Sequence, residues 1–203
     1  MCRSFLAESI PAATLTGIVE LGLQAPSAGH AQGLRLVLLE GSDRDDFWDL
    51  TLPSERRAGF RWQGLLVAPT LLLVFADPQA YVSRYSEPDK RRTGLGDSIE
   101  AWTTPYWTVD AGMAVMAMLL GAEDRGLGAL FFALAHGESE VRERFLVDEC
   151  FQTIGVIALG RPDVDDPDAL GSGRSSERPR VRADQIMRRG SGRPERAIFP
   201  AVE

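Results

Sequence analysis

The most constraining feature of this sequence is the run from Pro105 to Gly128, which leads directly into Ala129-Leu130-Phe131-Phe132. Between Val109 and Ala122 its only charged residue is Asp110. A helix without a polar face must be buried on every side. It is therefore either the central helix of the core or a helix at a subunit interface. Small residues that would let a second helix approach closely recur along it: Ala111, Gly112, Ala114, Ala117 and Gly121.

This run does not predict a membrane span. A helix that crosses a bilayer needs about 20 consecutive apolar residues. Here glycines interrupt the run, and Glu123-Asp124-Arg125 closes it. We expect no membrane partner.

Length and charge narrow the class of protein. A chain of 203 residues with 44% apolar residues is long enough for one domain with a sizeable core. Residues 1–160 carry 13 basic and 21 acidic side chains, whereas residues 172–199 carry eight arginines and three acids. The body should repel nucleic acid, and only the tail could attract a phosphate. We expect no nucleic-acid partner.

Cys2 and Cys150 are too few for a disulfide framework, and no signal-like segment precedes the first amphipathic helix. A reducing, cytoplasmic location is expected. His30 and His136 do not combine with the cysteines in a zinc-type spacing, so no metal site is predicted.

Hydrophobic periodicity predicts a chain that mixes helices and strands. A helix over 9–25 ends at Pro26, and a polar loop then precedes the first strand. Strands are predicted at 34–39, 71–76, 129–134 and 152–159. Short helices are predicted at 45–52, 61–67, 79–85 and 137–146. Residues 86–104 form a long gap typical of a lid or binding loop, and the chain from 163 onward reads as an arm.

Several catalytic motifs are missing. The sequence has no Gly-x-Gly-x-x-Gly after a strand, no Walker-type phosphate loop and no Gly-x-Ser-x-Gly elbow. An enzyme of this sequence would depend on a cofactor for its chemistry, and we expect no catalytic residue in the narrow sense.

Three stretches together resemble the FMN-dependent nitroreductase family. They are Arg3-Ser4-Phe5, the segment from Ala25 to Gly33, and the long apolar helix that runs into Gly126-Leu127-Gly128-Ala129. With residues 154–162 the resemblance covers nearly the whole chain. The segments 84–90 and 106–107 look similar to an actinobacterial-type branch of that family.

The resemblance implies an α+β fold with a central, mostly antiparallel sheet flanked by helices. Residues 1–162 would form the nitroreductase-like FMN-binding domain, and residues 163–203 an extended C-terminal arm that wraps around the partner subunit. The protein would be a homodimer interleaved through the long helix, with FMN sites at the interface.

The resemblance also carries over cofactor-binding residues. Arg3, followed by Ser4, matches the basic residue that lies against the pyrimidine edge of the flavin, where a cation stabilises negative charge on the reduced ring. Without the resemblance, Arg3 is one more flexible terminal arginine. Ser27, His30 and Gln32 fall on a Ser-x-x-Asn-x-Gln loop that reaches the flavin from the other subunit.

His30 stands where the family usually has Asn. An imidazole still donates one hydrogen bond, but it titrates near neutrality. The alternative is a surface or helix-capping histidine, and Gln32 could instead satisfy backbone groups of its own loop.

Phe131, Phe132 and Ala133 match the segment that packs on the isoalloxazine ring and offers it a backbone N–H. Adjacent strand residues point to opposite faces, so at least one phenylalanine belongs to the core. Arg180 and Arg182 resemble the late basic pair that holds the FMN phosphate, for which arginine is well suited. A solvated basic tail is the alternative.

One departure concerns the N-terminus. The family usually begins with an arginine pair whose first member also binds the phosphate, and that position would precede Met1. We expect either a start assigned too far downstream or weaker FMN binding.

The function implied is an FMN-dependent oxidoreductase that takes hydride from NAD(P)H and passes it to a small nitroaromatic, quinone or enone acceptor in a ping-pong cycle. An enzyme that uses O2 or degrades the flavin, a flavin-storage protein with residues 86–104 as a lid, and a dimeric interaction protein without FMN remain open.

Overall fold

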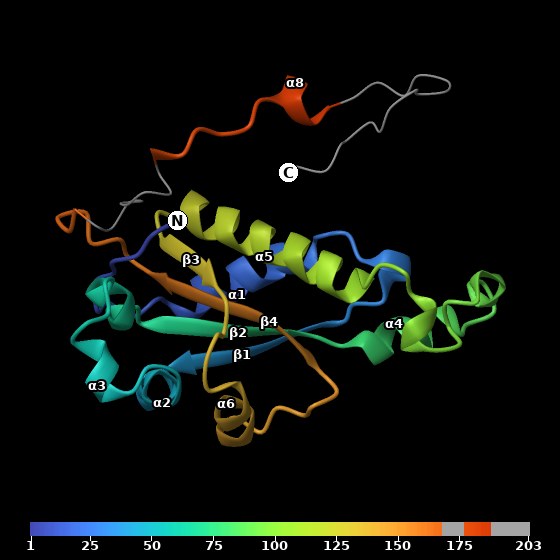
Figure 1. The fold of residues 1–203 in the computed structure, drawn as a ribbon, viewed down its shortest axis with the longest axis horizontal. Helices are drawn as coiled ribbons and strands as arrows, with labels where there is room; N and C mark the ends of the chain where they lie inside the picture. The colour runs from blue at the N-terminus through green and yellow to red at the C-terminus, as the bar shows by residue number, and fades with distance from the viewer. Residues whose placement is uncertain (168–176, 188–203) are drawn as a thin grey trace, which may run out of the picture. The chain divides into compact units, whose positions relative to one another are not determined.

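The computed structural model describes residues 1–167 and 177–187. The chain divides into two compact units, Met1–Gly171 and Ser172–Glu203. The first contains the sheet and the helices around it (Figure 1). Within the described part of the second, a short helix, α8, spans Ala183–Ile186.

The first unit is built on a four-stranded sheet in the order β1-β2-β4-β3, in which every neighbouring pair is antiparallel. Its strands are β1 (Leu34–Glu40), β2 (Thr70–Ala76), β3 (Gly128–Phe132) and β4 (Gln152–Gly160). All seven residues of β2 are buried, as its unbroken apolar run predicts for a central strand. β1 and β3 form the two edges.

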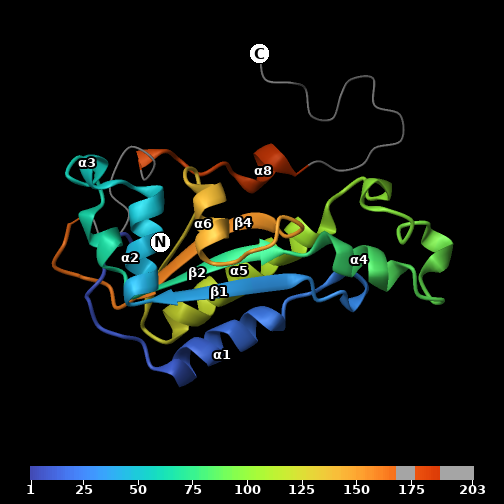
Figure 2. The same cartoon turned by 90° about the horizontal axis from the view of Figure 1, so that it is seen from below.

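Side chains along β2 point alternately to the two faces of the sheet, and each face is covered by its own pair of helices. Leu72 and Val74 face a cluster with α1 (Ala12–Leu23) and α5 (Tyr106–Asp124), while Leu71 and Leu73 face a second cluster with α2 (Ser42–Thr51) and α6 (Glu138–Arg144). Figures 1 and 2 show these helix pairs on opposite faces of the sheet. The predicted α+β architecture is confirmed.

Most predicted elements are confirmed to within a few residues, and one helix is corrected. The predicted helix at 61–67 is a 3₁₀ turn, η2 (Gln63–Val67), which ends where Ala68 must be extended before Pro69. Helix α3 (Ser54–Arg57) was not predicted. The remaining elements are α4 (Pro78–Tyr85) and the turns η1 (Ala28–His30), η3 (Arg91–Thr93) and η4 (Ile99–Ala101).

Helix α5 is not buried on every side within one chain, so of the two predicted places for it, the core and a subunit interface, the single chain does not provide complete burial. Its inner face packs on α1 and the sheet, but four large apolar side chains on the outer face are 37–54% exposed. They are Val109, Met113, Met116 and Leu120, which we call the α5 stripe. Their spacing of three and four residues places them on one side of the helix. In the described part of the chain, no helix is long and apolar enough to cross a membrane.

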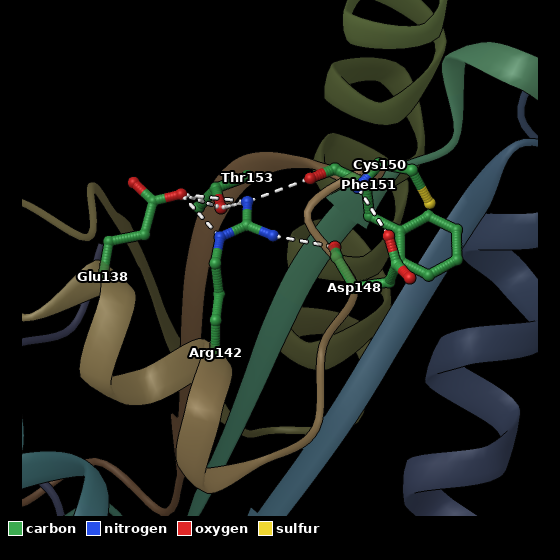
Figure 3. A network of polar contacts seen from close by, with 6 residues as sticks. All are labelled: Glu138, Arg142, Asp148, Cys150, Phe151 and Thr153. Carbon is green, nitrogen blue, oxygen red and sulfur yellow. Dashed lines mark hydrogen bonds and ion pairs between the residues drawn. The ribbon is translucent and has the colours of Figure 1, made fainter.

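Arg142 ties α6 to the chain that enters β4 (Figure 3). Its guanidinium donates to the carbonyl oxygens of Asp148 at 3.0 Å and Phe151 at 2.9 Å, and to the Thr153 hydroxyl at 2.7 Å. It also forms an ion pair with Glu138 at 2.9 Å. Hydrogen bonds from Thr153 and then Arg142 hold the pKa of Glu138 below its usual value. Arg142 thus connects α6 both to the turn before β4 and to Thr153 in β4.

Replacing Arg142 with alanine is expected to lower the free energy of unfolding by about 2 kcal/mol, because two carbonyl groups and Thr153 lose a donor. The ionised state of Glu138 stabilises the fold above its unfolded pKa, and this contribution is lost as the pH falls through the lowered pKa. Urea denaturation should therefore show a smaller difference from wild type in acid than at neutral pH. The exposed Arg56, changed to alanine, is the control, and an equal loss in both variants would contradict this role.

Candidate functional site

Two cavities contain most of the predicted site residues. The first, of about 460 Å³, opens beside the edge strand β3 and has mainly aromatic and aliphatic walls; we call it the aromatic cavity. Its lining comprises Met1, Arg3, Phe47, Trp48, Thr51, Leu52, Phe60, Trp62, Leu65 and residues 130–136. Arg3, Phe131, Phe132 and Ala133, predicted from separate parts of the sequence, are therefore neighbours.

The N-terminal segment is fixed along the edge of the sheet. The Cys2 N–H donates to the Ala129 carbonyl at 2.9 Å, and the Phe5 N–H donates to the Gly64 carbonyl at 3.1 Å. Arg3, between them, is half-buried, and its guanidinium carbon lies 5.4 Å from the centre of the Trp62 ring. In this structure Arg3 is a positioned cation at the cavity rather than a freely solvated terminal residue.

The same contact shows which backbone groups of β3 face outward. Because the Ala129 carbonyl accepts from Cys2, both polar backbone groups of Ala129 point away from β4. The pattern repeats every second residue, so the N–H and C=O of Phe131 also face the open edge. The cavity thus has a backbone donor beside Arg3.

Phe131 and Phe132 point to opposite faces, as predicted. Phe131 packs with the cluster under α1 and α5, whereas Phe132 packs with the cluster under α2. The Phe132 ring stacks on Trp48 with centroids 5.9 Å apart and planes 6° from parallel.

Ser4 is buried, with 2% of its surface exposed, and it does not line the aromatic cavity. Its carbonyl oxygen accepts hydrogen bonds from the Cys2 thiol at 3.0 Å and from the Asp163 N–H at 3.1 Å. Its side chain lies so close to Gly64 that any side chain at residue 64 would collide with it. Ser4 therefore fixes the segment that carries Arg3, and its direct contact with a cofactor stays a prediction.

Ser27, His30 and Gln32 line the second cavity, of about 320 Å³, which we call the loop cavity. The Gln32 N–H donates to the Ser27 hydroxyl at 3.0 Å, and the Gln32 amide nitrogen lies 2.6 Å from Nε2 of His30. The three predicted residues thus form one hydrogen-bonded group. His30 and Gln32 are exposed, so they are accessible to a ligand or to another chain.

The backbone of this loop is strained. Gly29, His30 and Gln32 have φ values of 62°, 61° and 55°. Positive φ is unfavourable for most side chains, although Asn, Asp and His adopt it more readily than others. This preference explains how His can stand where the family usually has Asn. Strained backbone often accompanies ligand sites.

Sequence reasoning missed the group that holds this loop. The carboxylate of Asp110, on α5, accepts from the Ala28 N–H at 2.7 Å and from the Tyr81 hydroxyl at 2.8 Å. Asp110 is buried and lines the loop cavity together with Tyr81. Burial and then the hydrogen bond to Asp110 raise the pKa of Tyr81, so this phenol remains a donor. The sequence feature that could have identified Asp110 is that it is the only charged residue at the start of an otherwise apolar helix.

The two cavities share no lining residue. Within one chain, Arg3 and the β3 residues therefore form one half of the predicted site, and the loop residues form a separate half. Arg180 and Arg182 belong to the second unit, and their contact with a phosphate stays a prediction. Arg182 there pairs with Asp184 at 2.9 Å. Among the described residues, no three His, Cys, Asp or Glu side chains group in a way that could hold a metal ion.

Solved structures of known proteins share this fold. A nitroreductase family protein from Streptococcus pneumoniae TIGR4 is 17% identical over 93% of this chain and 94% of its own, with a TM-score of 0.69. The NADPH:FMN oxidoreductase from Vibrio harveyi, solved with NAD+, is 21% identical over 95% of this chain and 74% of its own, with a TM-score of 0.65.

An FMN-dependent nitroreductase from Clostridium difficile R20291 is 17% identical over 86% of this chain and 88% of its own, with a TM-score of 0.58. At the level of sequence, the nitroreductase family model matches residues 1–161, which include both cavities. The chain therefore belongs to the nitroreductase family.

Proposed function

We propose that this protein is a homodimeric, FMN-dependent oxidoreductase that uses NAD(P)H to reduce a small organic acceptor. The observation that carries the proposal is the aromatic cavity, in which Arg3 and an outward-facing strand edge adjoin flat aromatic walls. Family membership and the flavin-dependent relatives support the same function.

The residues of the aromatic cavity fit FMN. A flavin ring has apolar faces and a polar edge rich in hydrogen-bond acceptors. The cavity offers aromatic walls, a cation and a backbone donor, and its volume of about 460 Å³ is typical of a site for a ligand of this size. Bound FMN would supply the chemistry, accepting hydride from NAD(P)H and giving it to the second substrate.

The protein itself would contribute position and electrostatics. The Arg3 guanidinium, half-buried beside Trp62, favours negative charge in the cavity. Apolar walls exclude water, which strengthens that electrostatic effect. Thr51 and His136 line this cavity, but hydride transfer through a flavin needs no nucleophile from the protein.

Dimerisation would join the two half-sites. The loop cavity and the aromatic cavity have separate linings, and the α5 stripe leaves an apolar face exposed on each chain. Packing the stripes of two chains together would bury that face and complete the apolar environment that the sequence of α5 predicts. Ser27, His30 and Gln32 would then reach the flavin of the partner, and the arm would wrap around the other subunit.

Steady-state kinetics with NADPH or NADH and a quinone or nitroaromatic acceptor test the proposal. A ping-pong cycle gives parallel lines in double-reciprocal plots when both substrates are varied, whereas intersecting lines would contradict it. The alternatives predict other results: a storage protein binds FMN that NAD(P)H does not bleach, and an O2-using enzyme forms product in air without any added acceptor.

A further inference from the structure

The carboxylate of Asp110 uses only one of its two oxygen atoms within the described chain. Oδ2 accepts both hydrogen bonds to this group, from the Ala28 N–H at 2.7 Å and from the Tyr81 hydroxyl at 2.8 Å, and Oδ1 has no partner among the described residues. Oδ1 is not enclosed by protein, since the only enclosed and unpaired side-chain nitrogen or oxygen atoms of the described residues are the indole nitrogens of Trp48 and Trp62. Because Asp110 lines the loop cavity, a molecule in that cavity can reach Oδ1.

The charge of Asp110 is the unusual feature of this cavity. Asp110 is the only buried charged residue in the described part of the chain, and it forms no ion pair there. Arg35 also lines the cavity, but its guanidinium pairs with Asp77 at 3.0 Å and donates to two backbone carbonyls. His30 is neutral when its Nε2 accepts from the Gln32 amide nitrogen, 2.6 Å away. The cavity therefore carries one uncompensated negative charge.

A buried carboxylate is unfavourable unless a cation or several donors compensate it. Two donors hold Oδ2, and nothing in the described chain compensates Oδ1. An ionised carboxylate only accepts hydrogen bonds, so a group that suits Oδ1 must donate. Opposite charge strengthens such a bond. An ammonium group meets both conditions.

The rest of the lining suits a small apolar body attached to that group. The volume of about 320 Å³ lies at the lower end of the range that is typical of small-molecule sites. Aliphatic side chains contribute much of the wall: Leu23, Pro26, Leu34, Ala111 and Ala114. A short alkyl chain would bury its surface against them.

We propose that the loop cavity is a binding site for a small organic cation, an ammonium group on a short aliphatic chain, which Asp110 recognises through Oδ1. The ligand neutralises the buried carboxylate that the described chain leaves unpaired. Residues 1–160 carry 21 acidic and 13 basic side chains, and this excess of negative charge favours the approach of a cation. The loop cavity shares no lining residue with the aromatic cavity, so this site does not depend on the proposed flavin chemistry.

Titration of the purified full-length chain with butylammonium chloride tests the proposal, and 1-butanol, of similar shape but without charge, is the matched probe. Alanines labelled with ¹³C at the methyl group report where each probe binds, and single Ala→Ser variants assign their signals. The signals of Ala111 and Ala114 should shift with the cation at concentrations where 1-butanol has little effect. Those of Ala133 and Ala135, which line the aromatic cavity, should stay in place.

Asp110→Asn isolates the charge. Its amide oxygen can keep the contacts with Ala28 and Tyr81, which leaves the amide N–H₂, a donor, in place of Oδ1. We expect the Kd for butylammonium to rise about tenfold or more and the affinity for 1-butanol to stay the same. Glu149→Gln makes the same change of charge at an exposed position and should leave both affinities unaltered.

Three results would overturn the proposal. They are a cation that binds no better than the alcohol, a cation that leaves the Ala111 and Ala114 signals in place, and an Asp110→Asn protein that binds butylammonium as wild type does. If Asp110→Asn does not fold, the comparison of the two probes on the wild-type chain still decides. Failure to bind FMN would contradict the proposed function and leave this result unchanged.

Discussion

Replacing Met116 with aspartate is expected to convert a dimer into monomers. Met116 lies in the α5 stripe between Met113 and Leu120 and is 52% exposed in the single chain. In the proposed dimer it is buried against the partner, and the twofold symmetry places two introduced carboxylates close together. Burying an unpaired carboxylate costs several kcal/mol, and the dimer would bury two of them. Sedimentation or light scattering should report the mass of one chain.

The matched control is Leu146→Asp. Leu146 is also an exposed apolar residue, at 91%, but it lies after α6 and outside the stripe. It has a φ of 54°, which aspartate tolerates better than leucine, so this change should leave both assembly and stability intact. A Met116→Asp protein that remains dimeric, or a wild type that is monomeric, would refute the assignment of the stripe to the interface.

Asp110→Ala is expected to lower the free energy of unfolding by about 3 kcal/mol and to weaken FMN binding at least tenfold. The buried carboxylate holds the Ala28 N–H and the Tyr81 hydroxyl, and hydrogen bonds to a charged group contribute about 1.5–3 kcal/mol each. Without it both donors lose their acceptor, and the loop that carries Ser27, His30 and Gln32 is released. Thermal unfolding and FMN titration measure the two effects.

Two further variants separate these contributions. Tyr81→Phe removes one donor and leaves the contact with Ala28, so it should cost about 1.5 kcal/mol and affect FMN binding little. Asp110→Asn keeps one acceptor oxygen and should fall between the other two. If Asp110→Ala unfolds more easily but binds FMN normally in the folded state, then Asp110 stabilises the fold without positioning the loop.

The sequence was most informative where burial is strongest. The strands predicted at 71–76 and 152–159 became the two inner strands; residues 71–76 and 154–159 lack polar side chains, because a strand covered on both faces has no need for polar alternation. Gly64 and the 3₁₀ turn around it could not be foreseen, since their conformation depends on the buried Ser4, some sixty residues earlier in the chain.

The candidate site residues were predicted from the resemblance to family motifs and not from hydrophobic periodicity or charge. Arg3 and Phe131 lie far apart in the sequence, and the pairing of Cys2 with Ala129 brings them together in the fold. The apolar sequence of α5 predicted burial on every side, whereas one chain buries only the inner face, and burial of the outer face by a second copy stays a prediction.

The absorption spectrum of the purified protein, after incubation with FMN and removal of the unbound flavin, tests the central claim most directly. The account predicts flavin bands that bleach anaerobically with NADPH or NADH and return when a quinone is added. Protein that stays colourless would contradict the flavin site, and bands that neither nucleotide bleaches would contradict the reductase.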